Sequence, residues 1–147
     1  PAGTKVTTSF SITPAQDSHG LMEVELQDSK GLAGLRLTFD STGTLSAKAG
    51  ARYKNFMTYK AGETYHISIK LNTENRFYTL KVNGKEVLTS LAFQPIAEVS
   101  RIVFRTGEVR RFPNVDTPAD QTYNLLKPGE VQREAVYLIN NLKTGTF

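Results

Sequence analysis

Apolar and polar residues alternate along most of this chain with the period of two that is typical of half-buried β-strands. In residues 64–71, for example, aromatic or aliphatic side chains at odd positions interleave with polar side chains at even positions. The strands that this pattern predicts cover residues 6–12, 22–26, 35–39, 45–47, 65–71, 78–82, 87–88, 102–104 and a last strand within 135–142. In that last strand the inward set is either Ala135, Tyr137 and Ile139 or Val136, Leu138 and Leu142.

Turn residues lie where these strands must end, in residues 28–31, 41–43, 60–62 and 72–75. Asn83-Gly84 predicts a two-residue hairpin, because both central residues of a type I′ turn need positive φ. About ten short strands separated by turns predict an all-β fold, a two-sheet antiparallel β-sandwich of the jelly-roll kind, formed by residues 1–147 as one domain. Residues 107–133 break the alternation and predict a long loop, with a short helical turn around 119–125.

Composition narrows the class of protein further. The 147 residues are 39% hydrophobic and 22% charged, as in a globular protein, and no apolar run reaches the ~18–20 residues of a membrane-spanning helix. The chain has no cysteine, which excludes disulfides, Cys-ligated zinc and thiol catalysis. Because the sequence starts at Pro1 with no signal segment, we expect a mature secreted protein or a domain of a larger one, bacterial and extracytoplasmic.

The charge is modestly basic, at +4, and it is unevenly distributed. Arg101, Arg105, Arg110 and Arg111 lie within eleven residues that hold one glutamate. Such a segment suits an anionic partner such as an acidic polysaccharide, and it equally suits a solvated basic face with no partner.

Strand parity predicts which basic side chains point to solvent. If Ile102 and Phe104 face the core, Arg101 and Arg105 face outward. On two other strands the same parity exposes Lys70, Lys81 and Phe77. If these strands share a sheet, one face combines four cations with an aromatic ring that can stack on a sugar, and arginine can bind both oxygens of a carboxylate.

The long loop adds further candidates. Arg110, Arg111 and Tyr123 complete the expected ligand-binding set. Asp116 and Asp120, together with loop carbonyls, could hold a calcium ion, since hard cations favour clustered oxygen ligands. Capping of turns by the two aspartates is the alternative. Apart from calcium, no cofactor is expected.

One acidic run raises the question of catalysis. Glu23, Glu25 and Gln27 alternate on one strand, and jelly-roll glycosidases use carboxylates in a similar alternation. Gln27 cannot titrate, and the chain contains no tryptophan to line a sugar cleft. An exposed acidic strand face is therefore the preferred interpretation. The two histidines have no triad or metal spacing, and no phosphate or dinucleotide motif occurs.

Two segments carry a resemblance to a known family. Residues 65–70, which open on Tyr65, and residues 77–85, which contain Val82-Asn83-Gly84, resemble the concanavalin A-like superfamily in its laminin-G-like form. Residues 35–39 and 100–104 resemble flanking strands of the same family. The resemblance implies a jelly roll found in lectins, in accessory modules of polysaccharide-degrading enzymes and in adhesion domains. The acid motif of the family's glucanases is not matched at residues 23–28, and the motifs of its alginate lyases are not matched either.

The first hypothesis is therefore a non-catalytic, lectin-like carbohydrate-binding module of a secreted polysaccharide-degrading enzyme, with an acidic glycan as partner. A protein–protein or adhesion domain is the second, and a glycan-cleaving enzyme using Glu23 and Glu25 is the third. Nucleic acid is not an expected partner, since no recognised motif accompanies the basic residues, and membrane insertion is not expected.

Overall fold

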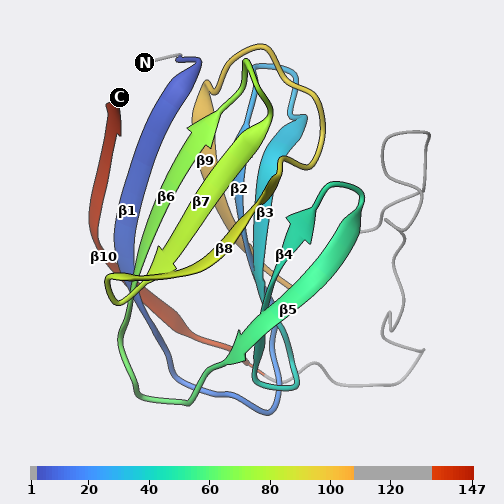
Figure 1. Cartoon of the computed structure of the whole chain (residues 1–147). Helices are drawn as coiled ribbons and strands as arrows, with labels where there is room; N and C mark the ends of the chain where they lie inside the picture. Colours follow the sequence, from blue (N-terminus) through green and yellow to red (C-terminus); the bar gives the residue numbers. More distant parts are fainter. Residues whose placement is uncertain (1–2, 108–133) are drawn as a thin grey trace.

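The computed structural model describes residues 3–107 and 134–147, and these form two antiparallel β-sheets packed face to face (Figure 1). The first sheet has the order β10-β1-β6-β7-β8, and the second has the order β5-β4-β3-β2-β9. In the first sheet the strands are β1 (Lys5–Pro14), β6 (Tyr65–Asn72), β7 (Phe77–Val82), β8 (Lys85–Leu91) and β10 (Tyr137–Thr146). In the second they are β2 (Met22–Gln27), β3 (Ala33–Phe39), β4 (Thr44–Ala49), β5 (Arg52–Thr58) and β9 (Arg101–Thr106).

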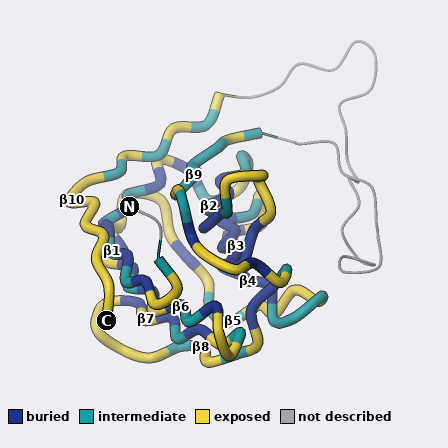
Figure 2. The backbone as a smooth tube through the Cα atoms, turned by 90° about the horizontal axis from the view of Figure 1, so that it is seen from above, coloured by how far each residue is buried: buried dark blue, intermediate teal, exposed yellow. Residues whose placement is uncertain are grey.

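The predicted fold class is confirmed, and so is the inward parity of the strands. The core between the sheets is made from the apolar halves of the alternating pattern, so that Phe10, Ile67, Leu35 and Val24 are fully buried. Figure 2 shows this buried layer along the middle of both sheets. In the last strand Ile139 lies opposite Ile12 and packs on the core, which selects the first of the two predicted inward sets.

Local chemistry explains where the strands turn. The Asp28 carboxylate accepts hydrogen bonds from the backbone N–H groups of Lys30 and Leu32 between β2 and β3, and Asp40 caps the next turn in the same way. Asn83 and Gly84 have φ angles of 53° and 82°, as the predicted type I′ hairpin requires. The first two turns order the consecutive strands β2, β3 and β4 into a meander, and the third joins β7 to β8.

Two features of the second sheet depart from the sequence pattern. Strand β5 was not predicted, because it is an edge strand exposed on most of its length and shows no apolar alternation. Strand β4 pairs only with Leu37–Phe39 of β3, and residues 92–94 lie beside the start of β3 instead. There Phe93 N donates to Gly34 O at 2.8 Å, and Gln94 N donates to Ala33 O at 3.0 Å. The position of residues 92–94 beside β3 brings Phe93 to the outer face of the second sheet.

Candidate functional site

The outer face of the second sheet carries a cluster of charged side chains that register brings together. Glu25 of β2 lies opposite Arg36 of β3, and Glu23 lies opposite Arg105 of β9. Such cross-strand pairs place side chains within contact distance on one face. With Lys48 of β4, these four residues form what is here named the ionic cluster.

Glu25 is the centre of the ionic cluster. Its Oε2 accepts a hydrogen bond from Nε of Arg36 at 2.6 Å. Its Oε1 accepts from Nη2 of Arg105 and from Nε2 of Gln27, the latter at 3.0 Å. Glu23 is 3.5 Å from Nε of Arg105 and 3.9 Å from Nε of Arg36. Three charge-assisted or polar donors therefore hold one carboxylate in place.

Burial of this face corrects one prediction. Glu23 and Glu25 are each only 2% exposed, and Arg36 is 4% exposed, so the preferred interpretation of an exposed acidic strand face was wrong. A buried carboxylate is costly unless it is paired and hydrogen-bonded, and the two arginines supply both. The hypothesis of a glycosidase at Glu23 and Glu25 is not favoured, because Glu25 is saturated by donors rather than open to a substrate.

Aromatic side chains extend the ionic cluster across the sheet. Nζ of Lys48 lies 4.2 Å from the ring centre of Tyr53 and 4.7 Å from that of Phe93, and it donates to Ala51 O at 3.2 Å. The guanidinium carbon of Arg36 is also 4.7 Å from the Phe93 ring. These contacts lie within the range of cation–π attraction. They fix the buried cations of Arg36 and Lys48 against the rings of Tyr53 and Phe93.

The protonation state of Arg36 is set by its neighbours. Burial by itself lowers the pKa of Arg36. The Tyr53 hydroxyl and the carboxylates of Glu25 and Glu23 outweigh burial and raise that pKa above its ordinary value. Arg36 is therefore charged at neutral pH.

Arg105 differs from the rest of the ionic cluster because its side chain is 32% exposed. Its Nη2 and Nε face the two glutamates. In the part of the chain that the structure describes, its Nη1 makes no hydrogen bond. The glutamates thus hold a guanidinium whose remaining N–H groups can bind an external anion.

Arg101 lies on the same side of β9 as Arg105, as parity predicted. It is exposed and donates from Nη2 to Ser29 O at 3.3 Å. It also lines an opening of about 190 Å³ between the two sheets, together with Thr8 and Leu26. Arg101 therefore stands apart from the ionic cluster.

The predicted single basic face is wrong, because its residues divide between the two sheets. Lys70, Lys81 and Phe77 lie on β6 and β7 of the first sheet, whereas Arg101 and Arg105 lie on β9 of the second. Parity was predicted correctly on each strand, but the outer faces of the two sheets look away from each other. The two halves of the set therefore face opposite sides of the sandwich.

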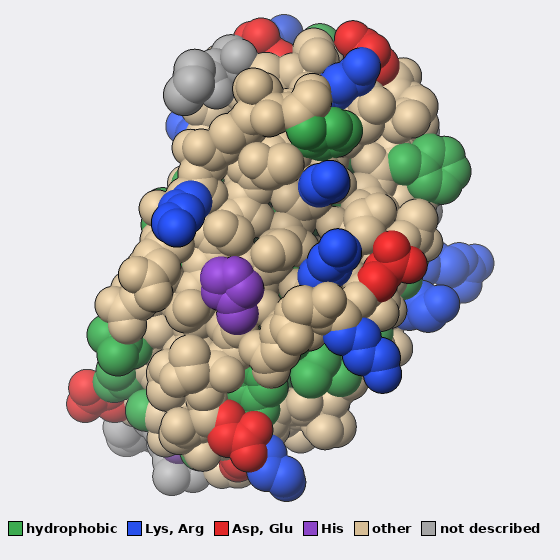
Figure 3. Space-filling view, turned by 60° about the vertical axis from the view of Figure 1, so that its left-hand side comes forward, with side chains coloured by type: hydrophobic (Ala, Val, Ile, Leu, Met, Phe, Trp, Pro, Cys, Tyr) green, Lys and Arg blue, Asp and Glu red, His purple; other side chains and the backbone are tan. Residues whose placement is uncertain are grey.

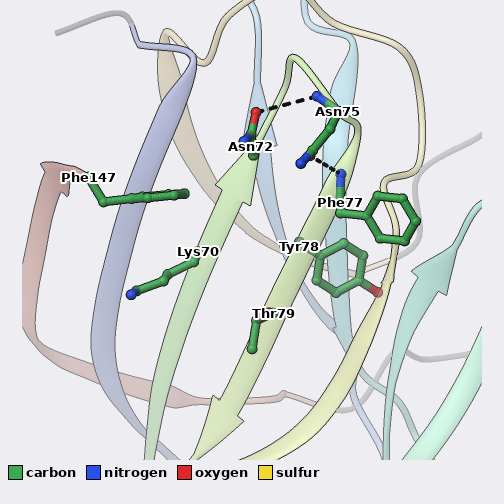
Figure 4. Close-up of a pocket in the computed structure, with 7 residues that line it drawn as sticks. All are labelled: Lys70, Asn72, Asn75, Phe77, Tyr78, Thr79 and Phe147. Carbon is green, nitrogen blue, oxygen red and sulfur yellow. Dashed lines mark hydrogen bonds between the residues drawn. The ribbon is translucent and has the colours of Figure 1, made fainter.

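The predicted residues on the first sheet lie at or near a pocket of about 210 Å³ (Figure 4). The residues that line it are Lys70, Asn72, Asn75, Phe77, Tyr78, Thr79 and Phe147. Two of the predicted ligand-binding residues, Lys70 and Phe77, are thus brought together. Lys81 lies on the same face outside this lining. The pocket is named here the Phe77–Phe147 pocket.

The remaining predicted residues lie outside the described part of the chain. These are Arg110, Arg111, Asp116, Asp120 and Tyr123. Within residues 3–107 and 134–147, no group of three or more His, Asp or Glu side chains is placed to hold a metal ion. The calcium site at the two aspartates stays a prediction. The same described residues contain no helix long and apolar enough to span a membrane.

The residues of these surfaces that sequence reasoning missed include Arg36, Lys48, Tyr53, Phe93 and Phe147. A signal for two of them was present. Arg36 stands between Leu35 and Leu37, and Lys48 between two alanines, so each is a charge in the outward register of a buried strand. Arg36 could have been matched with the alternating glutamates of the adjacent strand.

Comparisons with known proteins identify the family and agree with the fold. Residues 1–121 match the family described as "Sialidase-like, CBM domain", where CBM stands for carbohydrate-binding module. A solved chain titled "Sialidase" is 40% identical, with a TM-score of 0.85, and the match covers 99% of this chain and 14% of that one. No curated protein matches the chain.

More distant structures share the fold alone. The carbohydrate-binding module CBM66 from Bacillus subtilis is 11% identical, with a TM-score of 0.55, over 99% of this chain and 78% of that one. A Trypanosoma rangeli sialidase in complex with 2,3-difluorosialic acid is 12% identical, with a TM-score of 0.58, over 95% of this chain and 20% of that one.

The two-sheet jelly roll, its polar outer faces and these matches together define a non-catalytic carbohydrate-binding module. The chain belongs to the sialidase-like CBM domain family. It spans 14% of the length of the sialidase that it resembles at 40% identity.

Proposed function

We propose that this module binds a carboxylate-bearing sugar and that Arg105 contacts the carboxylate. One observation carries the proposal: two buried glutamates hold the guanidinium of Arg105, while its exposed edge keeps an unused nitrogen. A guanidinium fixed in this way loses little conformational freedom when an anion binds. Charge-assisted hydrogen bonds to a carboxylate are stronger than those to neutral hydroxyls. An acidic glycan is therefore the partner that this surface suits best.

The chemical class of that sugar is inferred from the relatives. The 40% identical chain is titled a sialidase, and the Trypanosoma rangeli enzyme is titled as a complex with a difluorosialic acid. Sialic acids carry a carboxylate on the sugar ring. We therefore propose a sialylated glycan, with residues 1–147 as one accessory domain of a larger, secreted, glycan-degrading enzyme. Such a module would raise the local concentration of the enzyme at its substrate through tethering.

The test is calorimetric titration of the chain with sialyllactose and with lactose, at low and at physiological salt. We expect binding of sialyllactose only, weakening as salt rises, because exposed charges are screened within ~8–10 Å. Arg105→Ala should weaken binding about 10- to 100-fold, because a charge-assisted hydrogen bond to the carboxylate is lost. Arg105→Lys keeps the charge but loses the planar guanidinium that Glu23 and Glu25 hold in place, and it should recover only part of the affinity.

Arg101→Ala is the matched control, since Arg101 is exposed on the same face of the same strand and bonds only a backbone carbonyl among the described residues. It should bind as the wild type does. Equal affinity for sialyllactose and lactose, indifferent to salt and to Arg105, would overturn the proposal.

A further inference from the structure

We propose that the Phe77–Phe147 pocket is a second saccharide-binding site, on the opposite face of the sandwich from the ionic cluster. It would take one pyranose ring of an acidic oligosaccharide. The inference rests on the carbohydrate-binding class of the module and on its proposed preference for acidic glycans. It adds a site that the strands of the first sheet build independently of Arg105 and its glutamates.

Two aromatic rings form the walls of this pocket. Phe77 is 49% exposed and Phe147 is 51% exposed, and Figure 4 shows their rings on either side of β6 and β7. Exposed phenylalanine is unfavourable in water, and the C–H face of a pyranose can cover it. Hydrogen bonds fix the main chain of both residues, since Phe77 N donates to Asn75 Oδ1 at 3.2 Å and Phe147 N donates to Lys5 O at 3.2 Å.

Polar groups on the floor and rim of the pocket suit the hydroxyls of a sugar. The Asn72 side-chain oxygen accepts from the backbone N–H of Glu74, and the Asn75 oxygen accepts from that of Phe77. Within the described residues, the amide nitrogens of these two asparagines donate no hydrogen bond. The turn thus fixes both amides and leaves their donors for a ligand. Thr79, opposite Lys70 in the strand register, adds a hydroxyl.

Charge on this face supports an anionic ligand. Nζ of Lys70 lies 5.5 Å from the ring centre of Phe147, so the cation stands beside an aromatic wall. The register places Lys5, Lys81 and Lys143 on the same outer face. Glu86 is the one acidic residue on the described strands of this sheet. Figure 3 shows separate lysine or arginine side chains on this face among other polar side chains and backbone, with acidic side chains nearer its margins. A carboxylate on the bound ring would meet Lys70.

The size of the pocket limits the ligand to a small unit. At about 210 Å³ it is smaller than the ~300–1,000 Å³ of sites that enclose drug-sized molecules. One ring of a longer chain therefore fits, with the rest of the glycan in solvent. A site on each outer face would let one module engage two glycan chains, which increases avidity without any further contact.

The test uses residues 1–147, labelled with ¹⁵N and titrated with sialyllactose and with lactose. We expect two molecules of sialyllactose for each chain and two sets of shifted amides, one of which contains Phe77, Thr79 and Phe147. Phe77→Ala and Phe147→Ala should each weaken the affinity measured from the amides of the pocket about tenfold. The affinity measured from the amides around Arg105 should stay unchanged. Lys70→Gln should reduce the preference for sialyllactose over lactose at this pocket alone.

Leu138→Ala is the matched control. Leu138 is 57% exposed on β10 of the same outer face, outside the pocket, so its loss should change neither set. If Phe77→Ala and Phe147→Ala leave every shift and the stoichiometry as in the wild type, the second site is wrong, whatever Arg105 does. If Arg105→Ala leaves binding intact while the two phenylalanine variants abolish it, the pocket is a site and the proposed role of Arg105 fails. Absence of any sialyllactose binding would overturn both.

Discussion

Glu25 and Arg36, on adjacent strands, form a nearly inaccessible ion pair in which Nε and Oε2 are 2.6 Å apart. Arg105 approaches the other oxygen of the same carboxylate from β9. Glu25 therefore joins three strands of the second sheet through side chains as well as through the backbone. Loss of one member of such a network leaves the others buried without a partner, which costs more than the pair itself contributes.

Replacement of Glu25 by Ala should consequently destabilise the fold by about 3–5 kcal/mol. Glu25→Gln should cost less, since the amide oxygen can still accept a hydrogen bond. Urea unfolding followed by circular dichroism measures both. Glu86→Ala, an exposed carboxylate on β8, is the control and should shift the midpoint little. A midpoint for Glu25→Ala equal to that of Glu86→Ala would show that the cluster has no role in stability.

Arg105 and Arg101 should differ in stability as well as in binding. An arginine that was only a surface charge would contribute little to folding, but Arg105 neutralises two carboxylates that are 2% exposed. Arg105→Ala should lower the free energy of unfolding by more than about 1 kcal/mol, while Arg101→Ala should change it little. Thermal unfolding of the two variants in one buffer makes the comparison. The reverse order would contradict the ion-pair geometry.

Stability should fall at alkaline pH because of buried tyrosines. Burial raises the pKa of Tyr59, Tyr65, Tyr78 and Tyr137 above the ordinary value. A raised pKa in the folded state means that the unfolded chain releases these protons first. Stability is therefore complete below about pH 10, the pKa of an unfolded tyrosine, and is lost as the pH rises toward the folded values. Melting temperatures measured from pH 8 to pH 12 should show the decline.

Tyr78→Phe isolates one of these contributions. The Tyr78 hydroxyl donates to Lys48 O at 2.7 Å, so its loss should cost about 1 kcal/mol at neutral pH. The variant should also lose stability less steeply above pH 10, because one buried proton no longer has to leave. A slope equal to that of the wild type would show that the pKa of Tyr78 is the same in the folded and unfolded states.

Two glycines provide a matched pair for backbone strain. Gly20 and Gly62 have φ angles of 87° and 82°, a region that side chains with a Cβ rarely adopt. A Cβ at Gly62 would meet nothing within 4 Å, whereas one at Gly20 would lie 2.6 Å from Cβ of Ala135 and 2.9 Å from Oη of Tyr137. Gly62→Ala should therefore cost about 1 kcal/mol and Gly20→Ala considerably more, by denaturant unfolding. Equal costs would show that the segment at Ala135 can move aside.

The sequence by itself determined which side of each strand faces the core. Side chains point alternately to the two faces of any strand, so Ile102 and Phe104 had to face the core if Arg101 and Arg105 did not. The hairpin at Asn83-Gly84 was predictable for a similarly local reason, since positive φ at two successive residues restricts the choice of amino acid. Edge strand β5 was missed because it has no buried side that would impose a pattern.

Only the tertiary structure decided which strands are neighbours. Parity is the same whichever sheet a strand joins, and so it could not separate Arg105 from Lys70 and Phe77, which face opposite sides of the sandwich. The burial of Glu25 was equally out of reach of local reasoning. A glutamate alternating with apolar residues is expected in solvent, and it is buried here because strand register places Arg36 on one side of it and β9 on the other. Register depends on pairing between segments as far apart as residues 25 and 105, which no local pattern contains.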